Sequence, residues 1–71
     1  MNTRDMNSNY QFIPRAYDKK NRLVWEFFND TICVAAGKYD FEKEKLDIEF
    51  DIMTDEDREA FDKVTLENDF V

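Results

Sequence analysis

The sequence predicts an α+β fold, a small antiparallel β-meander of about four strands with one C-terminal helix packed on one face. Three observations lead to this prediction. Short segments in which apolar and polar residues alternate recur between polar turns, as in hairpin-connected strands. A capping sequence near residue 54 precedes a segment with helical spacing. Seven Phe, three Tyr and one Trp in 71 residues supply a core, because each buried ring removes roughly 150–250 Å² from water.

The first nine residues are polar and have no periodicity, so we predict a disordered tail over residues 1–9 and a single domain over residues 10–71. A single Cys and the absence of His exclude an internal disulfide and the usual Cys/His zinc sites within one chain. The core must therefore be stabilised by packing.

Residues 10–17 and 22–28 are predicted to form a β-hairpin around the polar turn at residues 18–21. Pro14 has no amide hydrogen to donate, which places the first strand at a sheet edge or at a bulge. The second strand alternates between two faces, one carrying Leu23, Trp25 and Phe27 and the other carrying Val24, Glu26 and Phe28.

Asn29 and Asp30 predict a second turn, because both residue types tolerate left-handed backbone conformations. Two interpretations of residues 31–36 stay open. A strand suits their β-branched residues and continues the meander, with residues 39–41 extending it past a bulge at Gly37. A short helix would instead be capped at Asn29 or Asp30 and end at Gly37. The strand is the preferred interpretation.

Residues 46–52 carry the clearest pattern, after a turn over residues 42–45. The period of two predicts a strand with one face in the core and the other in water. The predicted core face holds Leu46, Ile48, Phe50 and Ile52, and the predicted solvent face holds Asp47, Glu49 and Asp51.

Thr54 predicts the start of a helix over residues 55–64, with Asp57 at the capping-box position. Acidic residues fill the first turn, where the helix dipole favours negative charge. Ala60, Phe61 and Val64 recur at helical spacing and are expected to pack on the sheet. In the tail that follows, over residues 65–71, Leu66 and Phe70 are the residues that could also pack on the domain.

The segment Pro14-Arg15-Ala16-Tyr17-Asp18-Lys19-Lys20-Asn21-Arg22 resembles the opening of the YopX family of phage proteins, where a phrase like F-R-A-W-D-K-x-N-K ends one strand and begins the next. Tyr17 stands where that family usually has Trp, and Pro14 where it usually has an aromatic residue. The resemblance implies a phage or prophage origin and a β-rich fold, and it transfers no site residues. The alternative is that the segment is a generic hairpin turn.

Catalytic chemistry is not expected. Cys33 lies between Ile32 and Val34 without any His to activate it, and an apolar setting makes a thiol inert. The single Gly excludes a Gly-rich phosphate loop. Asp55 begins a pattern like that of a calcium loop, but Ala60 and Leu66 replace its essential Gly and Glu. We therefore predict no enzyme, no cofactor and no metal site.

The charge is strongly polarised along the chain. Residues 1–38 carry a net charge of +2, whereas residues 39–71 carry −9. An array of carboxylates can imitate a row of phosphates and bind a basic partner. The predicted partner-binding residues are Asp47, Glu49, Asp51, Asp55, Glu56, Asp57, Glu59 and Asp62.

The first functional hypothesis is a non-enzymatic acidic interaction protein, encoded by a phage or prophage, which docks its C-terminal half on a basic nucleic-acid-handling host protein as an inhibitor or nucleic-acid mimic. The alternative is a structural or assembly protein that self-associates, for example as a homodimer, through aromatic or strand-edge contacts. A third interpretation is that the acids only keep the protein soluble.

The net negative charge argues against direct binding to nucleic acid. The sequence has no signal peptide and no run of about 20 apolar residues, so we expect no membrane association. A lone thiol suits a reducing compartment, and the expected location is the cytoplasm.

Overall fold

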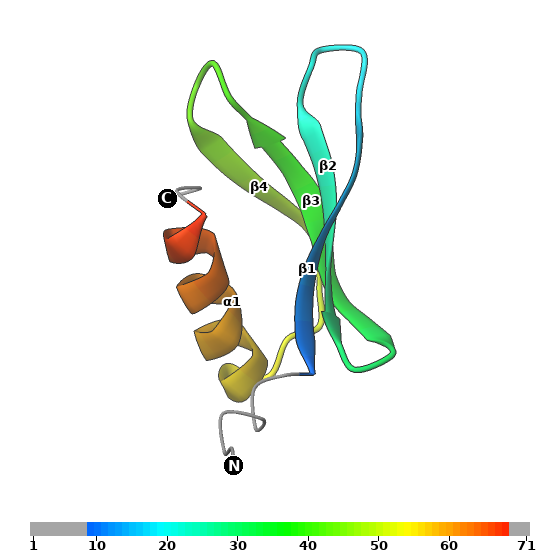
Figure 1. Cartoon of the computed structure of the whole chain (residues 1–71), viewed down its shortest axis with the longest axis vertical. Helices are drawn as coiled ribbons and strands as arrows, with labels where there is room; N and C mark the ends of the chain where they lie inside the picture. The colour runs from blue at the N-terminus through cyan, green and yellow to red at the C-terminus, as the bar shows by residue number, and fades with distance from the viewer. Residues whose placement is uncertain (1–8, 69–71) are drawn as a thin grey trace.

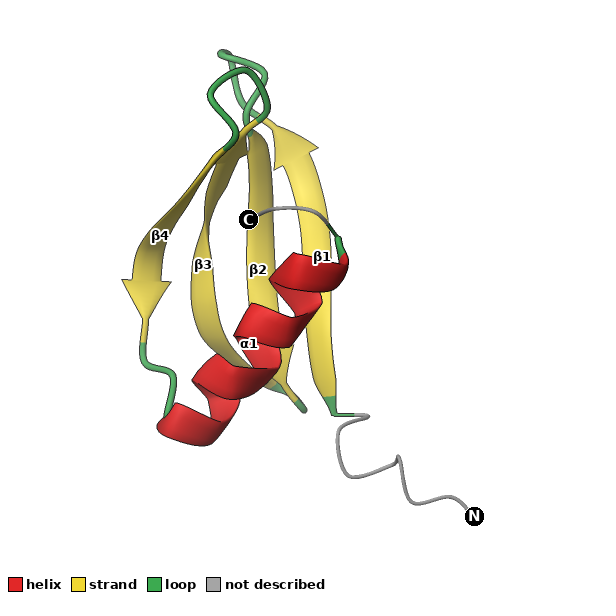
Figure 2. Cartoon of the chain, turned by 90° about the vertical axis from the view of Figure 1, so that its left-hand side faces the viewer, coloured by secondary structure: helices red, strands yellow, loops and turns green. Residues whose placement is uncertain are grey.

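The computed structural model describes residues 9–68, which form one antiparallel sheet and one helix. The strands are β1 (Tyr10–Tyr17), β2 (Leu23–Asn29), β3 (Ile32–Asp40) and β4 (Lys45–Asp51), paired in the order β1-β2-β3-β4. Helix α1 (Asp55–Glu67) lies against one face of the sheet (Figures 1 and 2). The predicted α+β meander is confirmed. Residues 1–8 of the predicted tail over residues 1–9 lie outside the described residues, as does Phe70, whereas the carbonyl of Asn9 accepts a hydrogen bond from the backbone N–H of Asp30 at 2.7 Å.

The turns are stabilised by short polar side chains. The carboxylate of Asp18 accepts hydrogen bonds from the backbone N–H groups of Lys20 and Arg22, each at 2.9 Å, and from Nε of Arg22 at 2.8 Å. The bond from the backbone N–H of Arg22 is the main reason why the pKa of Asp18 falls to about 2. Asn21 and Asp30 adopt positive φ angles of 62° and 61°, as these residue types tolerate.

The segment that had two interpretations is a strand. Strand β3 runs through Gly37, which therefore ends no helix. A Cβ atom at this position would overlap the backbone carbonyl oxygen of Asp47 and would lie 2.9 Å from Cζ2 of Trp25. Glycine is needed at residue 37 because β4 and the indole ring both approach its Cα closely.

Each of the three strand pairings contains a bulge. Arg15 is the extra residue between the paired residues of β1 and β2, and Val34 is the extra residue in β3 opposite β2. Glu49 is the extra residue in β4, because Gly37 pairs with Ile48 and Ala36 pairs with Phe50. Bulges bend a strand and increase its twist.

The bulge at Glu49 overturns the predicted register of residues 46–52. Leu46 and Ile48 pack against the core as expected, but Phe50 and Ile52 are 44% and 57% exposed. An extra residue reverses the alternation of side chains beyond it, so Phe50 faces away from the helix, beside Ala36. The strict alternation of the sequence gives no indication of this reversal.

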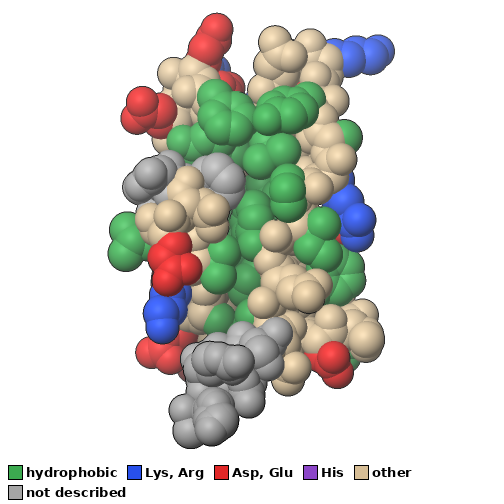
Figure 3. Space-filling view, viewed as in Figure 1, with side chains coloured by type: hydrophobic (Ala, Val, Ile, Leu, Met, Phe, Trp, Pro, Cys, Tyr) green, Lys and Arg blue, Asp and Glu red, His purple; other side chains and the backbone are tan. Residues whose placement is uncertain are grey.

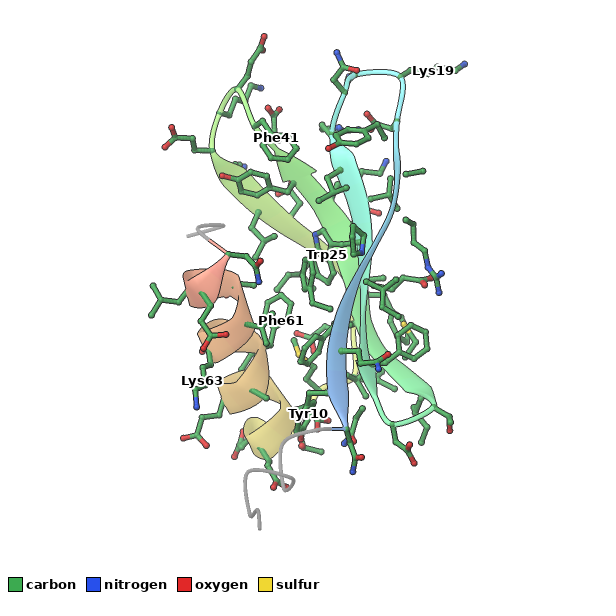
Figure 4. All side chains as sticks on the ribbon, in the orientation of Figure 1. Tyr10, Lys19, Trp25, Phe41, Phe61 and Lys63 are labelled. Carbon is green, nitrogen blue, oxygen red and sulfur yellow. The ribbon has the colours of Figure 1, made fainter. Side chains whose placement is uncertain are left out.

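The core lies between the sheet and α1, where Figure 3 shows a band of hydrophobic side chains. Phe61 of α1 is 1% exposed, and its ring centroid lies 5.1 Å from that of Phe27, 5.3 Å from that of Trp25 and 6.4 Å from that of Phe12. Figure 4 shows Phe61 pointing from the helix toward Trp25. The helix is thus held on the sheet mainly by the ring of Phe61, which packs against the three aromatic rings of the sheet.

Helix α1 begins at the predicted residue and is one turn longer than predicted. Thr65 is buried in the added turn, and its hydroxyl donates to the carbonyl of Phe61 at 3.0 Å. Leu66 points into solvent and is 64% exposed. In the described part of the chain, α1 is neither long enough nor apolar enough to span a membrane.

Candidate functional site

The outer surface of α1 carries an array of exposed carboxylates. Asp55, Glu59 and Asp62 follow one another along the helix, and Glu56 lies beside them. The helical rise separates the first three by about 6 Å and about 4.5 Å along the axis. This spacing is denser than the 6.6–6.8 Å or so between alternate residues of a strand. We call the four residues Asp55, Glu56, Glu59 and Asp62 the acidic helix surface.

The acidic helix surface is only partly neutralised by bases. Arg58 lies 3.5 Å from Asp62 and 3.6 Å from Asp51 at the end of β4, so it bridges two acids. Lys63 points away from the sheet (Figure 4). Within residues 9–68, Asp55, Glu56 and Glu59 take part in no ion pair. Their charges are therefore available to an external cation.

Asp57 does not belong to this surface, which corrects the predicted site. Its side chain is only 4% exposed. Its Oδ1 atom accepts hydrogen bonds from the hydroxyl of Tyr10 at 2.7 Å and from Nδ2 of Asn29 at 3.0 Å. Its Oδ2 atom accepts from the backbone N–H of Thr54 at 3.1 Å, which completes the predicted capping box. Asp57 thereby joins α1 to both β1 and β2.

The hydrogen bond between Tyr10 and Asp57 shifts the pKa values of these two side chains in opposite directions. The hydrogen bond from Tyr10 is the main reason why the pKa of Asp57 lies below its ordinary value. The same bond raises the pKa of Tyr10 to about 12, because losing the phenolic proton would place two negative charges side by side. Asp57 is thus a charged structural group that the fold keeps ionised.

The three acids predicted on the strand are also separated from one another. Asp47 and Glu49 lie on the sheet face opposite α1, at 4.0 Å from Lys45 and Lys38 respectively. Asp51 lies beyond the bulge and pairs with Ala35, so its side chain is on the helix side of the sheet, where it forms an ion pair with Arg58. Five of the eight predicted residues therefore share the helix side, two lie on the opposite face and one is buried.

A pocket of about 390 Å³ adjoins the acidic helix surface, between α1 and Tyr10. Its charged lining consists of the carboxylates of three Glu residues and the ammonium group of Lys63. Among residues 9–68, no group of three or more His, Cys, Asp or Glu side chains is arranged so that it could hold a metal ion. The residues that line the pocket are Tyr10, Glu56, Glu59, Ala60, Lys63, Val64 and Glu67.

Replacing Asp57 with Asn should lower the free energy of unfolding by about 1.5–3 kcal/mol at pH 7, the usual contribution of hydrogen bonds to a charged group. The lowered pKa of Asp57 means that its contribution is present above the unfolded value of about 3.9 and is lost as the pH falls through the folded value. The difference between wild type and variant should therefore shrink in acid. Urea unfolding at pH 7 and at successively lower pH values measures this.

Asp55→Asn is the matched control, because Asp55 lies in the same helical turn but is exposed. It should change stability by no more than about 0.5 kcal/mol. Equal effects of the two substitutions at pH 7 would show that the buried contacts of Asp57 do not stabilise the fold.

The contacts of Asp57 illustrate what the sequence could not reveal. Tyr10 and Asn29 are 47 and 28 residues away from it in the chain. The capping-box spacing predicted only its local partner, Thr54.

Comparisons with protein-family models, curated proteins and solved structures gave no match. Functional inference for this chain therefore rests on the chemistry of its surfaces.

Proposed function

We propose that the protein is a non-enzymatic binding protein that docks the acidic helix surface on a basic protein. The observation that carries this proposal is the group of three exposed acids, Asp55, Glu56 and Glu59, which have no cationic partner within residues 9–68. Charges of one sign on a rigid helix attract a complementary surface and accelerate its association. The capping box and the ring of Phe61 hold this helix in a defined orientation.

We propose further that the partner is a protein that handles nucleic acid and that docking blocks it. A helix that presents carboxylates every 4.5–6 Å or so offers the Lys and Arg side chains of such a partner a substitute for phosphates. The YopX-like segment, which covers the end of β1 and the turn before β2, supports a phage or prophage origin, and the lone thiol supports a cytoplasmic location.

The surroundings of Cys33 support a role without catalysis. The thiol is partly buried, and its Sγ atom lies 3.4 Å from the carbonyl oxygen of Ala35, which it contacts as a weak donor. The chain contains no His to accept the thiol proton. A cysteine without an activating base or an electropositive setting is a poor nucleophile.

Charge reversal on the helix tests the proposed function. Tagged wild-type protein is used to capture proteins from a bacterial lysate at about 50 and 200 mM salt, because charge-led contacts weaken over this range. Glu59→Lys should abolish capture of the specific partner, and added duplex DNA should compete with the protein for that partner.

Glu42→Lys is the matched control, since Glu42 is also an exposed acid but lies in the β3–β4 turn, away from α1. Both variants should keep the thermal transition of the wild type. Capture that resists salt and DNA and survives Glu59→Lys would contradict the proposed function.

A further inference from the structure

The face of the sheet opposite α1 is covered by no other element within residues 9–68 (Figures 1 and 2). Cross-strand partners share a face, and successive residues of a strand point to opposite faces. Because Trp25 and Phe27 are buried beneath the helix, their neighbours on β2 and the cross-strand partners of those neighbours form the open face. It comprises Gln11, Ile13, Ala16, Val24, Glu26, Phe28, Cys33, Ala36, Lys38, Asp47 and Phe50.

The open face is largely apolar around Glu26, which lies in its middle row, although the exposed side of an antiparallel sheet is ordinarily polar. Ile13, Phe28 and Ala36 lie half-buried among their neighbours, and Phe50 is 44% exposed. On this face β2 carries two apolar side chains, Val24 and Phe28, on either side of Glu26. Clustered apolar side chains on a surface mark a site for a partner.

Charges of opposite sign lie at the two edges of this face. Arg15, the bulge residue of β1, reaches it through an ion pair with Glu26. Asp47 and the bulge residue Glu49 lie at the β4 edge. The side chains of Arg15 and Glu49 are 51% and 58% exposed, so both can make further contacts.

We propose that a second copy of this chain covers the open face, in a dimer whose two-fold axis lies in the interface and runs along the strands. This axis places β1 of each copy over β4 of the other, and Arg15 then faces Glu49 of the partner subunit at two equivalent positions. An axis running across the strands would instead stack β4 on β4 and set the acids Asp47 and Glu49 against their own copies. Charge complementarity therefore selects the first arrangement.

The area of the open face fits a weak dimer. Four strands spaced about 4.8 Å apart and seven residues long at about 3.3 Å each give a sheet of roughly 440 Å² per copy. The total of about 900 Å² lies at the low end of specific interfaces, among those that form transiently. The acidic helix surface lies on the other side of the molecule, so this dimer leaves it free, and neither proposal depends on the other.

Sedimentation velocity between about 1 and 200 μM tests the dimer, because transient interfaces of this size dissociate in the micromolar range or above. The wild type should shift from monomer to dimer as its concentration rises. Phe50→Ser should raise the dissociation constant at least tenfold while keeping the thermal transition, since the side chain of Phe50 is exposed in the monomer. A wild type that is monomeric at every concentration would overturn the proposal.

Phe41→Ser is the matched control. Phe41 is 49% exposed and stacks on Tyr17 with a centroid distance of 6.2 Å, at the hairpin tips and away from the open face. This variant should dimerise like the wild type. If Phe41→Ser dissociates the dimer and Phe50→Ser does not, the contact lies at the hairpin tips and the proposal is wrong.

A charge exchange tests the direction of the axis. Arg15→Glu and Glu49→Arg should each weaken the dimer, and the double variant should recover it, because the pair between the two copies is restored with its signs exchanged. A double variant weaker than either single variant would exclude the proposed axis.

Discussion

Replacing Phe61 with alanine is expected to remove at least about a third of the domain's free energy of unfolding. The ring is 1% exposed and contacts three other aromatic rings, so its removal creates a cavity under the helix. Such truncations cost about 3–5 kcal/mol, whereas a domain of this size has a total stability of about 4–10 kcal/mol. Circular dichroism during urea unfolding measures the loss.

Leu66→Ala provides the control on the same helix, because Leu66 is 64% exposed. It should change the free energy of unfolding by less than about 0.5 kcal/mol. If Phe61→Ala proved as mild as Leu66→Ala, α1 would not be held on the sheet by the ring of Phe61, and the described core would be wrong.

Replacing Gly37 with alanine is expected to destabilise the protein by more than about 3 kcal/mol, beyond the usual range for overpacking. The added methyl group would collide with the backbone carbonyl of Asp47 and press on the indole of Trp25. Neither neighbour has room to move, because one belongs to the β3–β4 ladder and the other is fully buried. The thermal transition of the variant reports the effect.

The neighbouring Ala36→Gly is the matched control, since Ala36 lies on the same strand but faces away from the helix. It should cost only about 0.5–1 kcal/mol through backbone entropy. If Gly37→Ala destabilised the protein no more than Ala36→Gly does, β3 and β4 would not approach each other as described.

Local patterns in the sequence predicted most elements of this fold and left residues 31–36 open between a strand and a short helix. Alternating residues indicated the other strands, and the polar residues at their ends indicated the turns. Thr54 and Asp57 marked the start of α1 correctly, because a capping box is made by residues three apart in the chain. Each of these signals depends only on near neighbours.

Features that depend on distant residues could not be predicted in this way. The bulge at Glu49 arises from the pairing of β4 with β3, and it turns Phe50 to the opposite face without altering the alternation of residue types. The sequence favoured a strand with a bulge at Gly37 over a helix that ends there, but it could not explain why residue 37 is glycine, because it does not show what approaches its Cα.

The candidate site shows the same division. The acids of α1 were predicted correctly as exposed wherever helical geometry alone decided the outcome, as for Glu56 and Glu59. Asp57 was placed wrongly on the surface, because its burial depends on Tyr10 and Asn29. The open face had a visible signal in the apolar residues Val24 and Phe28, but only the position of α1 shows which face of β2 stays uncovered.

The meander order of the strands determines how the chain folds during synthesis. Every pairing in the sheet joins consecutive strands, so each hairpin can close as soon as its second strand has left the ribosome. The helix follows the sheet in the chain, and both faces of the nascent sheet therefore meet water until residues 55–67 have been made. During this interval the bulges and the charged residues of β4 protect the newborn sheet from pairing with other nascent chains.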